Sequence, residues 1–336
     1  MTEEKDFFEM DRRKFLKLSG YGLTAIGGYL AAGIINPFQN KISDAVQETF
    51  FSKDIPQQII EDRELTALIK RVFLGTGENI AILPASHNPT VGAELTKGTV
   101  EAAQPFKSVI FDLDERIKDI SGSVKTGISG NLICFGSPTS NIVARTVMQY
   151  KEIRGDGRNG HHFIPNETFE FPFLYELNGD LLLKEGHYCK RLVRDQEIII
   201  PNWGIRLSKD LLKIPETRND KIANDYLIIT NVPNIFHKQS YELGRRIIML
   251  GGTHATGTRA TKLLLLDKGL LKQIEDKSSR MSSWQAVVTI DNVNLETSAP
   301  QSLGGRVDVK EVNIDRQKLE SLVYKHDKLY QGYLSA

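Results

Sequence analysis

Cysteines are scarce in this chain, and the common catalytic motifs are missing. Its 336 residues include only Cys134 and Cys189, too few for a disulfide scaffold. Cys134 stands in the apolar run LICF, which favours a buried strand thiol over a bridge. No G-x-S-x-G, H-E-x-x-H or C-x-x-C motif occurs, which excludes the α/β-hydrolase nucleophile elbow and the common zinc sites. We therefore expect no metal site, and no pattern indicates a cofactor.

An excess of charge of one sign is missing too. The chain has 43 Lys+Arg and 42 Asp+Glu residues, a net charge of +1. Without a basic stripe we expect no nucleic-acid partner, and without an acidic tail no strongly charged partner. Beyond residue 45 no apolar run reaches 18 residues, so we expect no second membrane span.

The N-terminus carries the most specific pattern. Residues 11–17 read DRRKFLK, and residues 18–35 carry no charge. A basic segment followed by a short apolar segment is the layout of an export signal. The stretch resembles the twin-arginine translocation motif, S/T-R-R-x-F-L-K, and departs from it only at Asp11. The residues that carry this resemblance are Arg12, Arg13, Phe15, Leu16 and Lys17.

This resemblance implies export across the cytoplasmic membrane, with the twin-arginine translocation machinery as partner. Candidate cleavage sites are Ala31-Ala32-Gly33 and Ser43-Asp44-Ala45. If neither is cut, about 18 apolar residues suffice for a short membrane span. The protein would then be anchored by its N-terminal segment on the outer face of the membrane. If the signal is cleaved, the protein is expected to be released on the extracytoplasmic side.

Three parts follow from composition. Residues 1–45 hold the signal or anchor and the start of a linker, and residues 46–74 form a polar linker with a lead-in helix. Residues 75–336 form one domain, in which strands alternate with helices. We predict an α/β fold: a mostly parallel sheet with helices on both faces. An antiparallel, β-rich insertion is expected at about 151–215, where short β-rich runs are separated by turn residues.

Several segments have a definite expected structure. NLICFGSP over 131–138 predicts a strand buried on both faces. Residues 108–120, with apolar positions three and four apart, predict an amphipathic helix. SWQAVVTIDNVNL over 283–295 alternates apolar and polar residues and predicts an edge strand, and a charged helix is expected over 316–330.

Polar and glycine residues follow four of the predicted strands. In an open α/β sheet, ligands bind outside the carboxyl ends of the strands. Glycines let backbone amides approach an anion, and a helix N-terminus adds partial positive charge. We therefore predict a polar pocket at this edge. Its expected ligand-binding residues are Asn88, Ser137, Asn141, Asn234, Gly252, Gly257, Thr258 and Arg259.

The segment GGTHATGTR over 251–259 leaves two interpretations open. Gly252 and Gly257 have the outer spacing of a P-loop, but Thr258 and Arg259 stand where that motif needs Lys and Ser/Thr. The amides bind an anion, or the glycines only permit a tight strand–helix connection. For Asn141 the alternative to ligand recognition is a helix cap.

The succession GSPTSN, DYLIITNVPN and GGTHATGT resembles an α/β domain of uncharacterised function found in bacterial proteins, over about residues 75–300. This resemblance implies a fold and no activity.

Three functions remain open for residues 75–336, here called the body. The first is binding of a small polar or phosphorylated ligand at the carboxyl edge of the sheet. The second is a hydrolase or transferase that uses the same pocket, with His254 or His87 as general base. The third is a non-catalytic structural or interaction module.

Overall fold

A computed structural model describes residues 62–73, 79–83, 108–111, 130–138, 141–155, 158–163, 167–176, 188–193, 196–201, 203–208 and 211–334. The twin-arginine segment, the linker up to residue 61, His87 and Asn88 lie outside these residues. Within the described ranges, no helix is long and apolar enough to cross a membrane.

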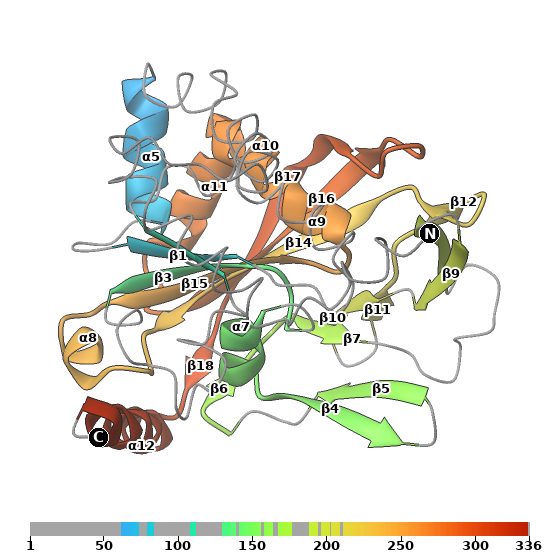
Figure 1. The fold of residues 1–336 in the computed structure, drawn as a ribbon. Coiled ribbons are helices and arrows are strands. Elements are labelled where there is room, and N and C mark those ends of the chain that lie inside the picture. The colour runs from blue at the N-terminus through green and yellow to red at the C-terminus, as the bar shows by residue number, and fades with distance from the viewer. Residues whose placement is uncertain are drawn as a thin grey trace, which may run out of the picture.

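A seven-stranded sheet forms the centre of the molecule (Figure 1). Its strand order is β17-β16-β14-β15-β3-β1-β2. The strands are β1 (Asn79–Leu83), β2 (Ser108–Phe111), β3 (Asn131–Phe135), β14 (Asp225–Pro233), β15 (Arg246–Gly252), β16 (Trp284–Val293) and β17 (Pro300–Glu311).

The prediction of a mostly parallel sheet is wrong. Strands β2, β1, β3 and β15 pair in parallel, whereas β15, β14, β16 and β17 pair antiparallel. The reason lies in the connection from β14 to β15, whose helix α8 (Lys238–Glu242) has only five residues. Such a helix rises about 7 Å, while seven-residue β15 runs about 23 Å. The chain therefore turns back at the edge where it left the sheet.

Helices cover one face of this sheet. They are α5 (Arg63–Phe73), α9 (Ala255–Arg259), α10 (Thr261–Leu266) and α11 (Lys268–Ser278). They lie above the sheet in Figure 1. Alternate strand residues such as Ile133 and Phe135 point into the core on this side, because successive strand side chains face opposite ways.

Helix α5 belongs to this core, although the sequence places it in a lead-in segment. Leu65, Leu68, Ile69, Val72 and Phe73 are all buried there. Their spacing of three and four residues gives the helix one apolar face. Burial of five large side chains makes α5 part of the globular body.

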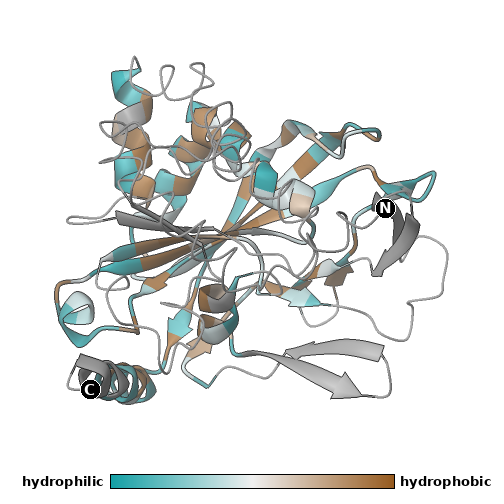
Figure 2. Ribbon diagram, viewed as in Figure 1, coloured by the Kyte–Doolittle hydropathy of each residue, from teal (hydrophilic) through white to brown (hydrophobic). Residues whose placement is uncertain are grey.

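The opposite face of the sheet carries a second core. It is covered by α7 (Ile142–Val147), α12 (Arg316–Leu334) and short strands (Figure 1). In the segment 169–175 every second residue is buried in this core. These residues are Phe169, Phe171, Phe173 and Tyr175. Figure 2 shows apolar residues along the central strands and on the helix faces turned toward them.

All the small sheets are antiparallel. Residues 151–215 hold most of their strands. The strands are β4 (Tyr150–Gly155), β5 (Arg158–Phe163), β6 (Phe169–Glu170), β7 (Leu174–Glu176), β8 (Tyr188–Val193), β9 (Gln196–Pro201), β10 (Gly204–Ser208), β11 (Leu211–Lys213), β12 (Thr217–Arg218), β13 (Lys221–Ile222) and β18 (Asn313–Ile314).

Two local predictions are also wrong. Residues 108–111 of the expected helix over 108–120 form strand β2 instead, because they pair in parallel with β1. Residues 112–120 lie outside the described part. The expected edge strand over 283–295 is β16, which pairs on both sides. Strand β17 lies at that edge, and Gln273 and Lys277 of α11 bond its backbone at Gly305 and Val307. These bonds cover edge groups that would otherwise be open to another strand.

Candidate functional site

The turn after β15 is the tightest backbone approach in the predicted site. Gly252 ends the strand, and α9 begins at Ala255. A Cβ atom at Gly252 would lie 2.5 Å from the backbone atoms Thr258 N and His254 O. A Cβ atom at Gly257 would lie 2.7 Å from Gly252 Cα. The two glycines are therefore required for the strand and the helix to pack against each other.

The amides of this turn have partners within the fold. Gly252 N donates to Thr258 Oγ1 at 2.9 Å, and Gly257 N donates to Asp225 Oδ2 at 2.5 Å. Thr258 and Asp225 are both buried. Two amides expected to bind an anion are thus taken up by a hydroxyl and a carboxyl group of the chain itself.

Asp225 occupies the anion position that the sequence assigns to a ligand. It is the first residue of β14, and its side chain is completely buried. Because β14 runs antiparallel to β15, its amino end lies beside the carboxyl end of β15. The Asp225 carboxyl also accepts hydrogen bonds from the Thr253 hydroxyl and from Tyr226 N at 2.8 Å.

Burial and hydrogen bonding act on Asp225 in opposite directions. Burial raises the pKa of its carboxyl to about 7, because the charged form loses its hydration. Hydrogen bonds from Thr253, Tyr226, Gly257 and His254 favour the charged form and lower that pKa. Burial has the larger effect, so the group is partly protonated at neutral pH.

His254 and Arg259 flank the same turn. His254 is the half-buried N-cap of α9, and its side chain makes no capping hydrogen bond. The guanidinium of Arg259 donates to the carbonyl oxygens of Thr297 and Ser298, at 3.4 and 3.3 Å. Thr256 Oγ1 donates to the same Ser298 oxygen at 3.1 Å. Arg259 therefore helps to fix α9 to the turn between β16 and β17.

Ser137 and Asn141 lie at the carboxyl end of β3, the strand beside β15. The Asn141 side chain is buried, and its oxygen accepts from Val143 N and Ala144 N as the N-cap of α7. Its nitrogen donates to Phe135 O at 3.0 Å. The backbone carbonyl of Ser137 accepts from Asn141 N at 2.9 Å. Asn141 thus joins strand, turn and helix, as expected for a helix cap and not for a ligand-binding residue.

Asn234 lies at the opposite end of the central strands from the glycine turn. It follows the carboxyl end of β14, and its side-chain nitrogen donates to Gly130 O at 2.8 Å, just before β3 begins. Its oxygen accepts from Phe236 N at 2.9 Å. Because β3 separates Gly130 from the Asn141 cap by about 16 Å of strand, Asn234 does not share a pocket with Asn141 or Gly252. The antiparallel direction of β14 separates them.

Three further buried hydrogen bonds could not be predicted from the sequence. Tyr175 donates from its hydroxyl to Gly251 O at 2.7 Å, and Gln285 bonds Phe173 N and the Thr230 hydroxyl. Each reaches across from a segment remote in sequence. Of the polar residues that the sequence analysis missed, only Asp225 could have been noticed, because its carboxylate stands directly before the apolar run YLII.

Arg246 organises the edge opposite the glycine turn. Its guanidinium donates to the side-chain oxygen of Asn231 at 2.7 Å, to Ser282 O at 2.5 Å and to Ser283 Oγ at 3.0 Å. It also donates to the backbone oxygen of Asn231 at 3.3 Å. All four acceptors are neutral, and burial lowers the pKa of Arg246 to about 10. The group remains a cation at neutral pH and ties β14, β15 and the start of β16 together.

A surface hollow of about 330 Å³ lies beside that edge. It is lined by Arg71, Val72, Asn231, Glu275, Ser278, Ser279, Met281 and Trp284.

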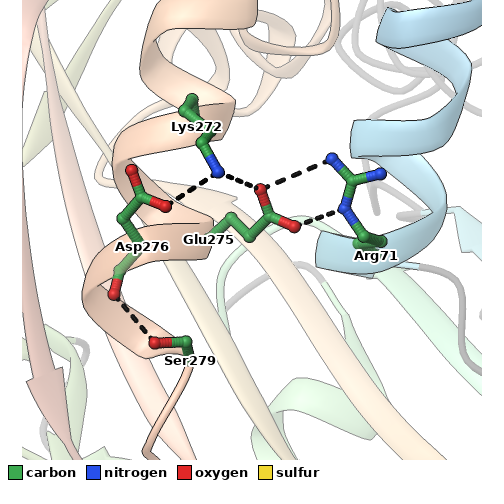
Figure 3. A network of polar contacts seen from close by, with 5 residues as sticks. All are labelled: Arg71, Lys272, Glu275, Asp276 and Ser279. Carbon is green, nitrogen blue, oxygen red and sulfur yellow. Dashed lines mark hydrogen bonds and ion pairs between the residues drawn. The ribbon is translucent and has the colours of Figure 1, made fainter.

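The charges at this hollow neutralise one another (Figure 3). Glu275 pairs with Arg71 of α5, and Lys272 lies 3.0 Å from Glu275 and 2.9 Å from Asp276. The hydrogen bonds from Arg71 and Lys272 lower the pKa of Glu275. These ion pairs connect α5 to α11, and the two charged residues in the described lining of the hollow, Arg71 and Glu275, neutralise each other.

Among the residues that the structure describes, no group of three His, Cys, Asp or Glu side chains is placed to hold a metal ion. Cys134 is completely buried in β3, and the side chain of Cys189 lies outside the described part. No protein-family model matches the chain, and no curated protein or solved structure matches it either.

Proposed function

We propose that this chain is an exported or membrane-tethered protein whose body acts as a non-catalytic structural or interaction module. The export part rests on the DRRKFLK segment and the uncharged run after it. The role of the body rests on the way in which the polar groups of the glycine turn are used.

One observation carries this choice among the three functions. The Gly257 amide bonds the buried carboxyl of Asp225, and the Gly252 amide bonds the buried hydroxyl of Thr258. A ligand anion would have to displace a group that is covalently part of the fold. A buried polar group left without its partner costs about 1–3 kcal/mol, so displacement is unfavourable.

Ligand binding at the carboxyl edge remains the second candidate. Ser137, Gly252 and Thr258 do lie at the same edge of neighbouring strands, which favours that function. A hydrolase or transferase would use this edge with His254 as base. Both need groups that are not already engaged in packing the turn.

A thermal-shift screen separates these candidates. Nucleotides, sugars and inorganic phosphate are tested on the purified body at concentrations up to the millimolar range. A ligand at 100 times its Kd would add about 2.7 kcal/mol of stability, or roughly 5–10 °C in Tm for a domain of this size. We expect no shift. A shift that Arg259→Ala abolishes would restore the ligand-binding candidate.

Export is tested separately by cell fractionation. Arg12→Lys with Arg13→Lys keeps the charge but removes the arginine pair, so we expect the protein to stay in the cytoplasm. Lys14→Arg is the matched control, because it changes the variable position between the pair and Phe15. Export that continues unchanged in the double variant would contradict the proposed address.

A further inference from the structure

The described part of the C-terminal helix α12 packs against the second core along one face. Among the α12 side chains that the structure describes, up to residue 328, Leu319, Val323 and His326 are buried, spaced by four and three along the helix. Tyr324, between them in sequence, is 65% exposed. All of these contacts lie in the second core, and no described side chain of α12 belongs to the core on the α5 side of the sheet. The sheet therefore keeps one complete core without α12.

His326 is a polar residue in this apolar contact. Its side chain is 8% exposed, and its ring packs against the Phe236 ring in a T-shaped arrangement, with centroids 5.1 Å apart and planes at 68°. Its buried Nδ1 atom makes no hydrogen bond to any described residue. The neutral imidazole ring can occupy this apolar contact much as a hydrophobic side chain does. An imidazolium would place a charge and an unbonded N–H against Phe236.

The charged groups of the two packed helices do not offset such a charge. On α12, Lys325 carries like charge next to His326, while Asp327 accepts from the Lys238 backbone amide of α8 at 3.1 Å. On α8, Lys238 also pairs with Glu242, and the ring of His237 bonds Ser240. Burial, and then the charge of Lys325, lower the pKa of His326 to about 4.

We propose that α12 is an acid-released latch, whose docking to the sheet weakens as the pH falls from about 6 toward 4 while the sheet itself stays folded. His326 is the group that senses pH, since the undocked ring is free to take a proton that the docked ring excludes. The sign follows from linkage: a basic group whose pKa is lowered by docking supports docking fully above its free pKa, near 6.5, and that support is lost as the pH falls toward 4.

The magnitude is large enough to measure. For a free pKa near 6.5 and a docked pKa of about 4, the ratio of undocked to docked α12 rises on the order of 100-fold between pH 7.5 and pH 4.5. Hydrogen exchange with mass spectrometry, corrected for the intrinsic effect of pH, follows this ratio in peptides that cover α12. Peptides that cover β15 report the sheet in the same sample.

We expect protection of α12 to fall on the order of 100-fold by pH 4.5, with β15 unchanged. His326→Phe keeps an aromatic contact with Phe236 and removes the proton, so its α12 protection is expected to be independent of pH; His326→Leu serves if the Phe variant does not fold. His254→Gln, at the glycine turn and remote from α12, controls for the loss of a histidine and should behave as wild type, because the His254 side chain makes no capping hydrogen bond. The latch is refuted if wild-type α12 protection ignores pH, if His326→Phe loses it equally, or if β15 opens together with α12.

Discussion

Gly252→Ala tests whether the glycine turn serves packing. The added methyl group would meet backbone atoms of residues 254, 257 and 258, two of them at 2.5 Å. Backbone cannot move aside as the end of a flexible side chain can. Overpacking usually costs about 1–3 kcal/mol and sometimes more. Three backbone contacts place this variant at about 3 kcal/mol or above.

The assay is unfolding by heat or denaturant, followed by circular dichroism. A loss of 3 kcal/mol corresponds to a fall in Tm of roughly 6–12 °C for a domain of this size. Gly305→Ala is the matched control. Its new methyl group would meet nothing within 4 Å, and Gly305 is exposed in β17. We expect a change within about 0.5 kcal/mol.

Equal stability of the Gly252→Ala variant and the wild type would refute the packing role. The glycine would then be required for another reason, of which close approach of a ligand to the backbone is the first.

Further variants test the surrounding contacts and their dependence on pH. Asn141→Ala removes the cap of α7 and the bond to Phe135 O, so it should cost about 2 kcal/mol in urea unfolding. Leu68→Ala, at a side chain that is 2% exposed, should cost about 2–5 kcal/mol, whereas Lys70→Ala on the exposed face should be nearly neutral; equal effects would mean that α5 is no part of the core. Burial raises the pKa of Asp225 in the folded protein to about 7. Its contribution to the free energy of unfolding is therefore full below pH 4 and falls by about 4 kcal/mol as the pH rises to 7. Asp225→Asn should remove this fall. The free energy of unfolding of the wild type minus that of the variant should therefore decrease from pH 4 to pH 7, and an increase in this difference would contradict the raised pKa.

Strong apolar runs allowed the main strands to be predicted from sequence. NLICF forms the fully buried β3, DYLIIT lies within β14, and RIIML lies within β15. The C-terminal charged helix is α12. Residues 108–120 misled because their spacing fits a helix as well as a strand, and pairing with β1 decided in favour of a strand over 108–111.

Strand direction was beyond the reach of local pattern. Whether β14 runs with or against β15 depends on how far the α8 connection reaches, not on any residue within the strands. This direction determined the site: it took Asn234 to the far edge and brought Asp225 to the glycine turn. The spacing of Gly252 and Gly257 correctly indicated a close backbone approach, but the group approached is the chain's own helix and carboxyl.

Amide hydrogen exchange at Gly252 and Gly257, measured by NMR in the protein without added ligand, tests directly whether the turn is satisfied within the fold. Both amides should exchange as slowly as the central residues of β15, because each bonds a buried group of the chain. Rapid exchange of both amides in the folded protein would show that they are open to solvent and available to a ligand, contrary to the structural role proposed for this turn.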